Sequence, residues 1–374
     1  MRLFVSLILL ILFASALAAQ TDPKPSPTPK TDEQEQRVRV FTEEVRLPVV
    51  ATDAGGHYDA ALEADEVLVL EDGAPQQIRS IRHIPSNVLL ILDTGGGDNI
   101  GLGGLSKKTS TTRDVALRIL SLLASGDQFA VVQSSDRAEL LQTWTSDKQQ
   151  VARVLKSKLF AGKRSRIFES MAKAAQVLSD RPEGSRDVVL ITDGVETPGG
   201  KVDLDEGLKK LAEARATVHI ISYTAFIRQK DDKQPSNIKV GERPASENPI
   251  TANDPTLAPG STRSPSFGVS IRFDPAMKRK RKAYEKETEN SEKWLTDLAT
   301  ETGGTIFLPQ SSDEMMSHAD RVAREIGAEY IVTYRPTRPL SAAKPGEYRR
   351  VEVASRRVGL YLRSRKGYVV PAQE

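Results

Sequence analysis

Two runs of consecutive apolar residues form the clearest pattern in the chain, and an aspartate follows each of them. The first run covers residues 88–92 and ends at Asp93, and the second covers residues 188–191 and is followed by Thr192 and Asp193. A run that is apolar at every position predicts a strand buried on both faces, as in a parallel sheet covered by helices. Because ligands bind at the carboxyl ends of such strands, the two aspartates are predicted to lie on one rim of one sheet.

Strands and helices alternate from about residue 86 onward. Helical spacing places Val115, Ile119 and Leu122 on one face of the first helix, and similar patterns recur along the chain. Successive strand–helix units predict an α/β fold with a doubly wound, mostly parallel central sheet. The predicted strands cover residues 88–92, 128–133, 188–191 and 217–223, and the predicted helices cover 112–124, 148–159, 167–178 and 204–214.

A long segment interrupts this domain. Residues 226–288 are rich in Pro, Ser, Asn and charge, which predicts a disordered insertion. The basic run at 278–282 inside it is interpreted as solvated, since no aromatic platform for nucleic acid accompanies it. The pattern then resumes and ends near residue 336, with helices predicted at 292–301 and 312–326 and strands at 305–308 and 329–334.

Alternating β patterns flank the domain, which is predicted to cover residues 86–336. Residues 38–85 predict a small β domain or an N-terminal β layer. Residues 337–374 predict a C-terminal β extension, in which strands at 348–354 and 359–363 form a hairpin.

The N-terminus carries the pattern of a secretory signal peptide. Arg2 precedes an apolar stretch at residues 3–13, and small residues with Ala-x-Ala spacing follow up to Ala19. This order predicts a signal peptide at residues 1–19 and export to the periplasm or the extracellular space. The alternative is a retained membrane anchor, although the apolar stretch is shorter than the roughly 18 residues of a spanning helix. Residues 20–37 are Pro-rich and predict a disordered linker.

Composition narrows the classes of function. The 374 residues include 53 basic and 50 acidic ones, with a formal net charge of +3, and this near balance does not indicate a nucleic-acid partner. The absence of cysteine excludes disulfides, thiolate metal sites and a cysteine nucleophile. The four histidines lack metal-ligand spacing, and no hydrolase motif is present, so we predict a protein that is not an enzyme. No later segment is apolar enough to span a bilayer, and the pattern does not indicate an oligomeric state.

The paired aspartates suggest chemistry with a hard cation. Mg²⁺ and similar divalent cations prefer oxygen ligands, and they usually keep several waters. Asp93, Asp193 and nearby hydroxyl groups offer such ligands. A free coordination position would accept a carboxylate from a protein partner.

Three segments resemble the von Willebrand factor A domain over residues 87–223. They are Asp93-Thr-Gly-Gly-Gly97, Ser165-Arg-Ile-Phe-Glu-Ser170 and Thr192-Asp193-Gly194. In that family they form the metal-ion-dependent adhesion site (MIDAS), on a Rossmann-like fold. The resemblance implies metal ligands at Asp93, Ser165 and Asp193, and partner contacts at Thr94, Gly95, Gly97 and Ser165.

The site departs from the family pattern at two positions. The family's first segment reads Asp-x-Ser-x-Ser, and here Gly95 and Gly97 replace both serines, so two hydroxyl ligands are missing. Thr94 and Asp98 lie nearby and are the candidates to compensate, although alternation along the strand directs Thr94 away from Asp93. Two interpretations remain open. Either the degenerate site still holds Mg²⁺ or another divalent cation, or the aspartates only cap turns by accepting backbone N–H bonds.

A longer pattern resembles von Willebrand factor A-related proteins that are common in acidobacterial genomes. It includes Val69-Leu-Glu-Asp-Gly73 and extends to the C-terminal β segments. The resemblance implies an exported, non-enzymatic protein-binding module that recognises an acidic side chain of its partner. The alternative is a structural envelope scaffold or assembly subunit without metal. A hydrolase that uses the paired aspartates is the weakest hypothesis, because no nucleophile or general base stands beside them in the sequence.

Overall fold

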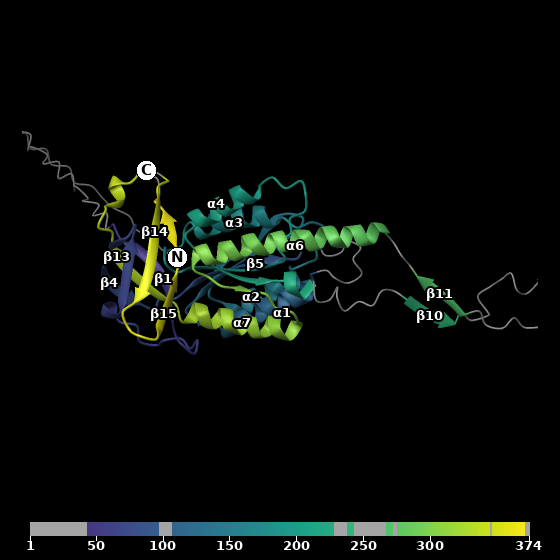
Figure 1. Cartoon of the computed structure of the whole chain (residues 1–374), viewed down its shortest axis with the longest axis horizontal. Helices are drawn as coiled ribbons and strands as arrows, with labels where there is room; N and C mark the ends of the chain where they lie inside the picture. Colours follow the sequence, from purple (N-terminus) through teal and green to yellow (C-terminus); the bar gives the residue numbers. More distant parts are fainter. Residues whose placement is uncertain are drawn as a thin grey trace, which may run out of the picture. The chain divides into compact units, whose positions relative to one another are not determined.

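The computed structural model describes residues 43–96, 107–227, 238–242, 267–271, 275–344 and 346–370 (Figure 1). The predicted signal peptide, the linker and Gly97 lie outside the described residues, as does most of the predicted insertion. The described residues all belong to one unit, Glu43–Glu374.

A six-stranded sheet forms the centre of this unit, in the order β12-β9-β8-β5-β6-β7. All neighbouring pairs are parallel except β6 with β7, which is antiparallel. This arrangement confirms the predicted α/β fold with a mostly parallel sheet. The strands are β5 (Asn87–Asp93), β6 (Gln128–Ser134), β7 (Ala138–Thr145), β8 (Arg186–Thr192), β9 (Thr217–Ser222) and β12 (Ile306–Phe307).

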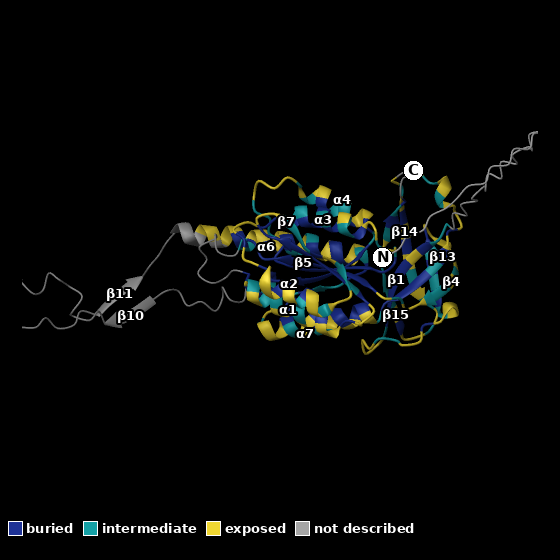
Figure 2. Ribbon diagram, turned by 180° about the vertical axis from the view of Figure 1, so that it is seen from behind, coloured by how far each residue is buried: buried dark blue, intermediate teal, exposed yellow. Residues whose placement is uncertain are grey.

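Helices cover both faces of the central sheet, which explains the uninterrupted apolar runs at residues 88–92 of β5 and 188–191 of β8. Leu90 of β5 belongs to a buried cluster with Val115 of α1, whereas its neighbour Leu89 belongs to a second cluster with Met171 of α3. One layer contains α1 (Thr109–Leu122), α2 (Lys148–Ser157) and α7 (Ser312–Gly327), and the other contains α3 (Ile167–Leu178), α4 (Leu204–Glu213) and α6 (Pro275–Thr302) (Figure 1). The strands between them are buried, and exposed residues lie on the outer faces of the helices (Figure 2).

Two antiparallel four-stranded sheets pack together beside the central sheet. Their orders are β15-β1-β13-β4 and β16-β14-β2-β3. Both sheets contribute to one apolar core, which includes Leu47, Val69 and Val351, so they form a small β sandwich. The strands are β1 (Val45–Asp53), β2 (Val67–Glu71), β3 (Ala74–Pro75), β4 (Gln77–Arg82), β13 (Tyr330–Arg335), β14 (Tyr348–Ser355), β15 (Leu360–Ser364) and β16 (Gly367–Val369).

The sandwich corrects two expectations. The strand predicted at 329–334 is not the last strand of the doubly wound sheet, because β13 pairs with β1 and β4. The strands predicted as a C-terminal hairpin lie in different sheets, since β15 pairs with β1 while β14 pairs with β2 and β16. In both cases the strand pairs with β1, which is distant in the sequence, and the paired strands bury their apolar side chains in the sandwich core. β7 was not expected at all.

The predicted insertion also needs correction where it is described. β10 (Ile238–Glu242) and β11 (Phe267–Ile271) form an antiparallel pair, and α6 begins at Pro275 rather than near residue 292. Part of α6 is buried at helical spacing through small polar residues, Thr288 and Ser291, which explains why its composition looked like that of a loop. Arg279, Lys280 and Lys282 of the basic run are exposed, as predicted.

Candidate functional site

The carboxyl ends of β5 and β8 bring the two aspartates to the same rim. The strands pair in parallel with Leu92 opposite Ile191, so Asp93 and Asp193 follow at neighbouring ends. Both are buried, with exposed fractions of 0% and 2%. Ser165, which lies just before α3, donates its hydroxyl hydrogen to Asp93 Oδ1 at 3.0 Å. The structure therefore places the three predicted metal-ligating side chains together.

A lysine side chain lies between the two carboxylates. Lys107 Nζ donates to Asp93 Oδ2 at 2.5 Å and to Asp193 Oδ1 at 2.8 Å. Lys107 immediately precedes the N-cap residue of α1, and only 2% of its side chain is exposed. The buried rim thus contains an internal cation supplied by the chain itself.

The remaining carboxylate oxygens also accept hydrogen bonds. Asp93 Oδ1 accepts the backbone N–H of Gly95 at 3.2 Å, and Asp93 Oδ2 accepts the Thr192 hydroxyl at 2.6 Å. Asp193 Oδ1 accepts the backbone N–H of Val195 at 3.0 Å, and Asp193 Oδ2 accepts the hydroxyl of Tyr284 at 2.6 Å. Every carboxylate oxygen of the pair therefore has at least one donor.

Helix α6 covers the rim above Asp193. Ser291 Oγ donates to the backbone carbonyl of Asp193 at 2.6 Å. Gly194 has a φ of +70°, and a Cβ atom there would lie 2.8 Å from Ser291 Cβ and 2.9 Å from Leu295 Cδ1. Glycine at 194 thus allows both the turn and the close approach of the helix.

The first segment of the motif packs tightly against the loop that precedes Ser165. A Cβ atom on Gly95 would lie 1.8 Å from the carbonyl oxygen of Arg164, so residue 95 has no room for a serine. Gly96 N–H donates to Gly162 O at 3.2 Å, and Gly162 N–H donates to Thr94 O at 3.1 Å. The Thr94 hydroxyl donates to Phe160 O at 2.8 Å, away from Asp93, as alternation predicted.

Electrostatics favour a charged ammonium at the rim. Burial is the largest influence on Lys107 and by itself lowers its pKa, but Asp193 and Asp93 together outweigh burial and raise the pKa. Burial raises the pKa of Asp93, an effect that the nearby ammonium only partly offsets. Burial and the charge of Asp193 hold the pKa of the Tyr284 hydroxyl well above its usual value, so this group stays a neutral donor.

As arranged here, these residues do not fit a divalent cation. The ammonium of Lys107 stands between the two carboxylates, and their other oxygens already accept hydrogen bonds. Residue 95 contributes no hydroxyl group, and Gly97 lies outside the described residues. Within the described ranges, no group of three or more His, Asp or Glu residues is arranged to hold a metal ion.

The sequence interpretation did not include Lys107, Thr192 as a donor, or Tyr284. Lys107 follows a Gly-rich stretch and Tyr284 lies in the segment interpreted as an insertion, so neither has a fixed spacing to the motif. One signal was available in the sequence. The loss of two neutral oxygen ligands weakens metal binding, and two buried carboxylates without a metal ion need another positive group. The predicted partner contacts Thr94 and Ser165 are buried, at 2% and 1% exposure, and therefore are not on the surface.

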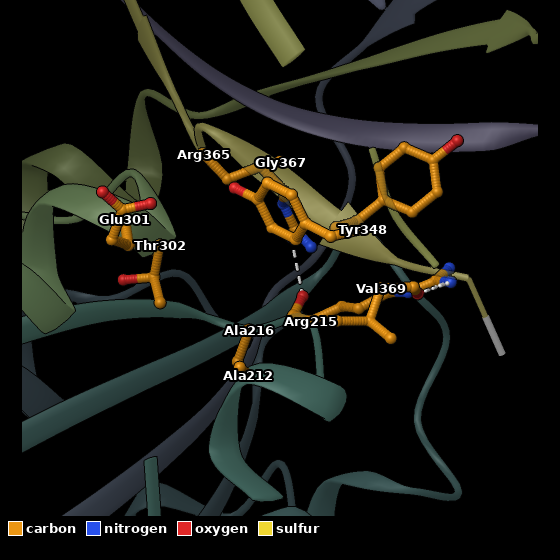
Figure 3. A pocket seen from close by; sticks show the side chains of 10 residues that line it. Ala212, Arg215, Ala216, Glu301, Thr302, Tyr348, Arg365, Gly367 and Val369 are labelled. Atoms are coloured by element: carbon orange, nitrogen blue, oxygen red, sulfur yellow. Dashed lines mark hydrogen bonds between the residues drawn. The ribbon is translucent and has the colours of Figure 1, made fainter. Parts of the chain in front are cut away.

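A hollow of about 80 Å³ lies apart from the aspartates, near α4 and β16 (Figure 3). Arg215 and Arg365 line it, together with Tyr348 and Tyr368. Arg365 Nη2 donates to Arg215 O at 2.6 Å, and Arg215 Nη2 donates to Val369 O at 2.6 Å. These bonds join the β sandwich to the central domain, so we interpret the hollow as part of that joint.

The fold and the rim define a doubly wound α/β domain in which two buried carboxylates meet at the carboxyl ends of neighbouring parallel strands. Residues 88–196 match the family model of the von Willebrand factor type A domain. This part of the chain is therefore a von Willebrand factor type A domain, which confirms the resemblance seen in the sequence.

Several solved structures are similar to this chain at low identity. A von Willebrand factor type A protein from Catenulispora acidiphila is 11% identical with a TM-score of 0.41, over 89% of this chain and 74% of that chain. An aerotolerance-related membrane protein from Bacteroides fragilis is 14% identical with a TM-score of 0.36, over 64% and 99% of the two chains. Proximal thread matrix protein 1 from the mussel byssus, with a zinc-occupied MIDAS motif, is 15% identical with a TM-score of 0.31, over 37% and 38%.

The curated proteins contain no match to this chain. In the part of the chain that the structure describes, no helix is both long and apolar enough to cross a membrane.

Proposed function

We propose that this chain is an exported, non-enzymatic protein-interaction module that binds its partner without a metal ion. The observation that carries the proposal is the closed rim, where Lys107 and Tyr284 already occupy the carboxylates of Asp93 and Asp193. This arrangement leaves no coordination position for a partner's carboxylate. Both aspartates are also buried, which disfavours a hydrolase that uses them.

We place the interaction surface on the loop at residues 158–164, which lies over the degenerate motif. Thr94, which is buried, and Gly96 hold this loop through hydrogen bonds to Phe160 O and Gly162 O. The side chain of Phe160 is 47% exposed, and the loop also exposes Lys163 and Arg164. An aromatic side chain among basic ones suits an acidic segment of a protein partner.

The proposal is tested by affinity capture of exported proteins from the source organism. The wild-type chain, Phe160→Ala and Tyr361→Ala are used as baits, each with and without a chelator. Tyr361 is the matched control, because it is an aromatic residue of β15 that is 62% exposed. We expect a partner that is retained in chelator and with Tyr361→Ala, and that Phe160→Ala loses. A partner released by the chelator would contradict the proposal.

A direct metal titration supplies an independent check. Calorimetric titration of Mg²⁺, Mn²⁺ and Ca²⁺ into the wild-type protein is expected to show no binding heat, and the melting temperature should not change. Saturable heat with one ion per chain would show that the rim does take up metal and would refute the metal-free proposal.

The second candidate function is a structural scaffold or assembly subunit without metal. The saturated hydrogen bonding of both carboxylates favours it, because such a rim stabilises the domain without contributing to recognition. A scaffold that assembles through other surfaces would keep all its partners in Phe160→Ala, which separates the two functions.

A further inference from the structure

The ammonium of Lys107 lies where two motif aspartates converge, at 2.5 and 2.8 Å from their oxygens. We propose that Lys107 is a permanent internal substitute for a divalent cation, and that removing its side chain opens a divalent-cation site between Asp93 and Asp193. The inference goes beyond the proposed function, because it concerns the charge that completes the rim and not the partner.

Charge balance explains why the rim needs a cation. The carboxylates of Asp93 and Asp193 have almost no contact with water, and an unpaired buried carboxylate is strongly unfavourable. Neutral donors alone, such as Thr192 and Tyr284, do not supply positive charge. The ammonium is compact and carries three donors, so one group can bond to both carboxylates at once.

A covalently attached cation behaves differently from a bound ion. It does not dissociate and no chelator removes it. A divalent ion that entered the rim would have to displace the ammonium, which would leave a buried positive charge next to the metal. The wild-type rim therefore excludes metal although it retains two motif carboxylates.

The residues that would remain after loss of the lysine side chain suit a hard cation. They are the carboxylates of Asp93 and Asp193 and the hydroxyl group of Ser165, which lies 3.0 Å from Asp93 Oδ1. Mg²⁺ and Mn²⁺ accept such oxygens and complete their coordination with water, for which the removed side chain leaves space.

The test compares the wild-type chain with Lys107→Ala and with Lys108→Ala, all prepared in chelator. Lys108 is the matched control, because it is the next residue, of the same type, and exposed. We expect Lys107→Ala to melt at a lower temperature than the other two chains. On titration with MnCl₂, Lys107→Ala should bind one Mn²⁺ and regain part of the lost melting temperature, and adding Asp193→Ala should abolish that binding.

Three results would overturn the inference. They are an unchanged melting temperature of Lys107→Ala in chelator, no Mn²⁺ uptake by the folded variant, and equal Mn²⁺ uptake by the wild-type chain. If the wild-type chain takes up no metal and Lys107→Ala also takes up none, the substitution inference fails while the metal-free function stands.

A measurement on the wild-type protein covers the case in which Lys107→Ala does not fold. A buried, paired ammonium exchanges its protons slowly, so ¹⁵N-edited NMR of the wild-type protein should show a protected lysine Nζ signal. The signal should disappear in Lys107→Arg and persist in Lys108→Arg. Its absence from the wild-type spectrum would contradict the inference.

Discussion

The carbonyl oxygen of Arg164 lies so close to residue 95 that the main chain itself prevents a side chain there. A Cβ atom would lie 1.8 Å from that oxygen and 2.8 Å from the α-carbon of Ser165. Because the obstacle is backbone, it cannot rotate away as a flexible side chain would. Packing against the backbone therefore requires a glycine at residue 95 of this protein.

Restoring the family's serine at this position should damage the domain. We expect Gly95→Ser to lower the free energy of unfolding by about 3 kcal/mol or more, since overpacking against fixed atoms costs at least the upper end of the usual range. Gly327→Ser is the control, because a Cβ atom at residue 327 meets nothing within 4 Å. The free energy of unfolding of both variants is measured by urea denaturation. A Gly95→Ser protein of wild-type stability would show that the loop at 160–165 moves easily.

At the scale of single residues, the sequence predicted which carboxylates meet but not what pairs with them. Asp93 and Asp193 could be placed together because each follows a buried parallel strand, and such strands end at one rim. Lys107 could not be placed, since its approach depends on how the chain returns from the Gly-rich stretch to α1. Short-range patterns do not determine that path.

At the scale of secondary-structure elements, the last residue of β2 organises the core of the sandwich. Glu71 is buried, and its carboxylate accepts bonds from Arg349 at 2.9 Å, Tyr334 at 2.8 Å and Tyr368 at 2.9 Å. Arg349 is fully buried and also donates to Pro339 O at 2.9 Å. One carboxylate therefore connects β2 to β13, β14 and β16.

Removing this carboxylate should destabilise the sandwich strongly. We expect Glu71→Ala to lower the free energy of unfolding by about 3 kcal/mol, because the buried guanidinium of Arg349 would lose its closer carboxylate and keep only Glu347, at 3.3 Å. Glu352→Ala is the matched control, since Glu352 pairs with Arg350 at an exposed position of β14. The control should lose less than about 1 kcal/mol. Equal losses in chemical denaturation would show that Glu71 does not organise the core.

Element type was easier to predict from the sequence than element partners. β5, β8 and α3 follow from uninterrupted apolar runs and helical spacing, which are local signals. The partners of β13 and β15 are strands near the other end of the chain, and no local signal names them. The sequence predicts too short a helix for α6, because Thr288 and Ser291, rather than large apolar residues, form part of its buried face.

At the scale of the whole molecule, one carboxylate joins the central domain to the sandwich. Glu325 of α7 lies 3.4 Å from His219 of β9 and 2.7 Å from Arg363 of β15. Burial, the largest influence, raises the pKa of Glu325, but His219 and Arg363 outweigh it and lower the pKa from 4.5 to about 2. Burial lowers the pKa of His219, but Asp187 and Glu325 outweigh it and raise the pKa above 6.5.

These two pKa shifts predict a range of pH in which the contacts of Glu325 with His219 and Arg363 stabilise the protein most. Glu325 binds its proton less readily when folded, so its contribution is complete above pH 4.5 and is lost as the pH falls towards about 2. His219 binds its proton more readily when folded, so its contribution is complete below pH 6.5 and is lost as the pH rises through its folded pKa. The contacts of Glu325 should therefore contribute most to the free energy of unfolding between pH 4.5 and 6.5.

This range can be measured by urea unfolding across pH. Glu325→Gln should reduce stability near pH 6 by up to about 3 kcal/mol, since one pKa unit corresponds to about 1.4 kcal/mol. The variant should also lose less stability than the wild type between pH 4.5 and 2. Glu213→Gln, at an exposed position of α4, should leave the profile unchanged. A wild-type profile that is flat below pH 4.5 would contradict the role of Glu325.

The pairing of β1 constrains how this protein folds. β1 covers residues 45–53 and pairs on its two sides with β13 and β15, whose residues end at 335 and 364. The sheet around β1 therefore closes through contacts between segments that are far apart in the sequence, which form slowly. Until both partners are in place, β1 is an unpaired edge strand that can pair with another chain.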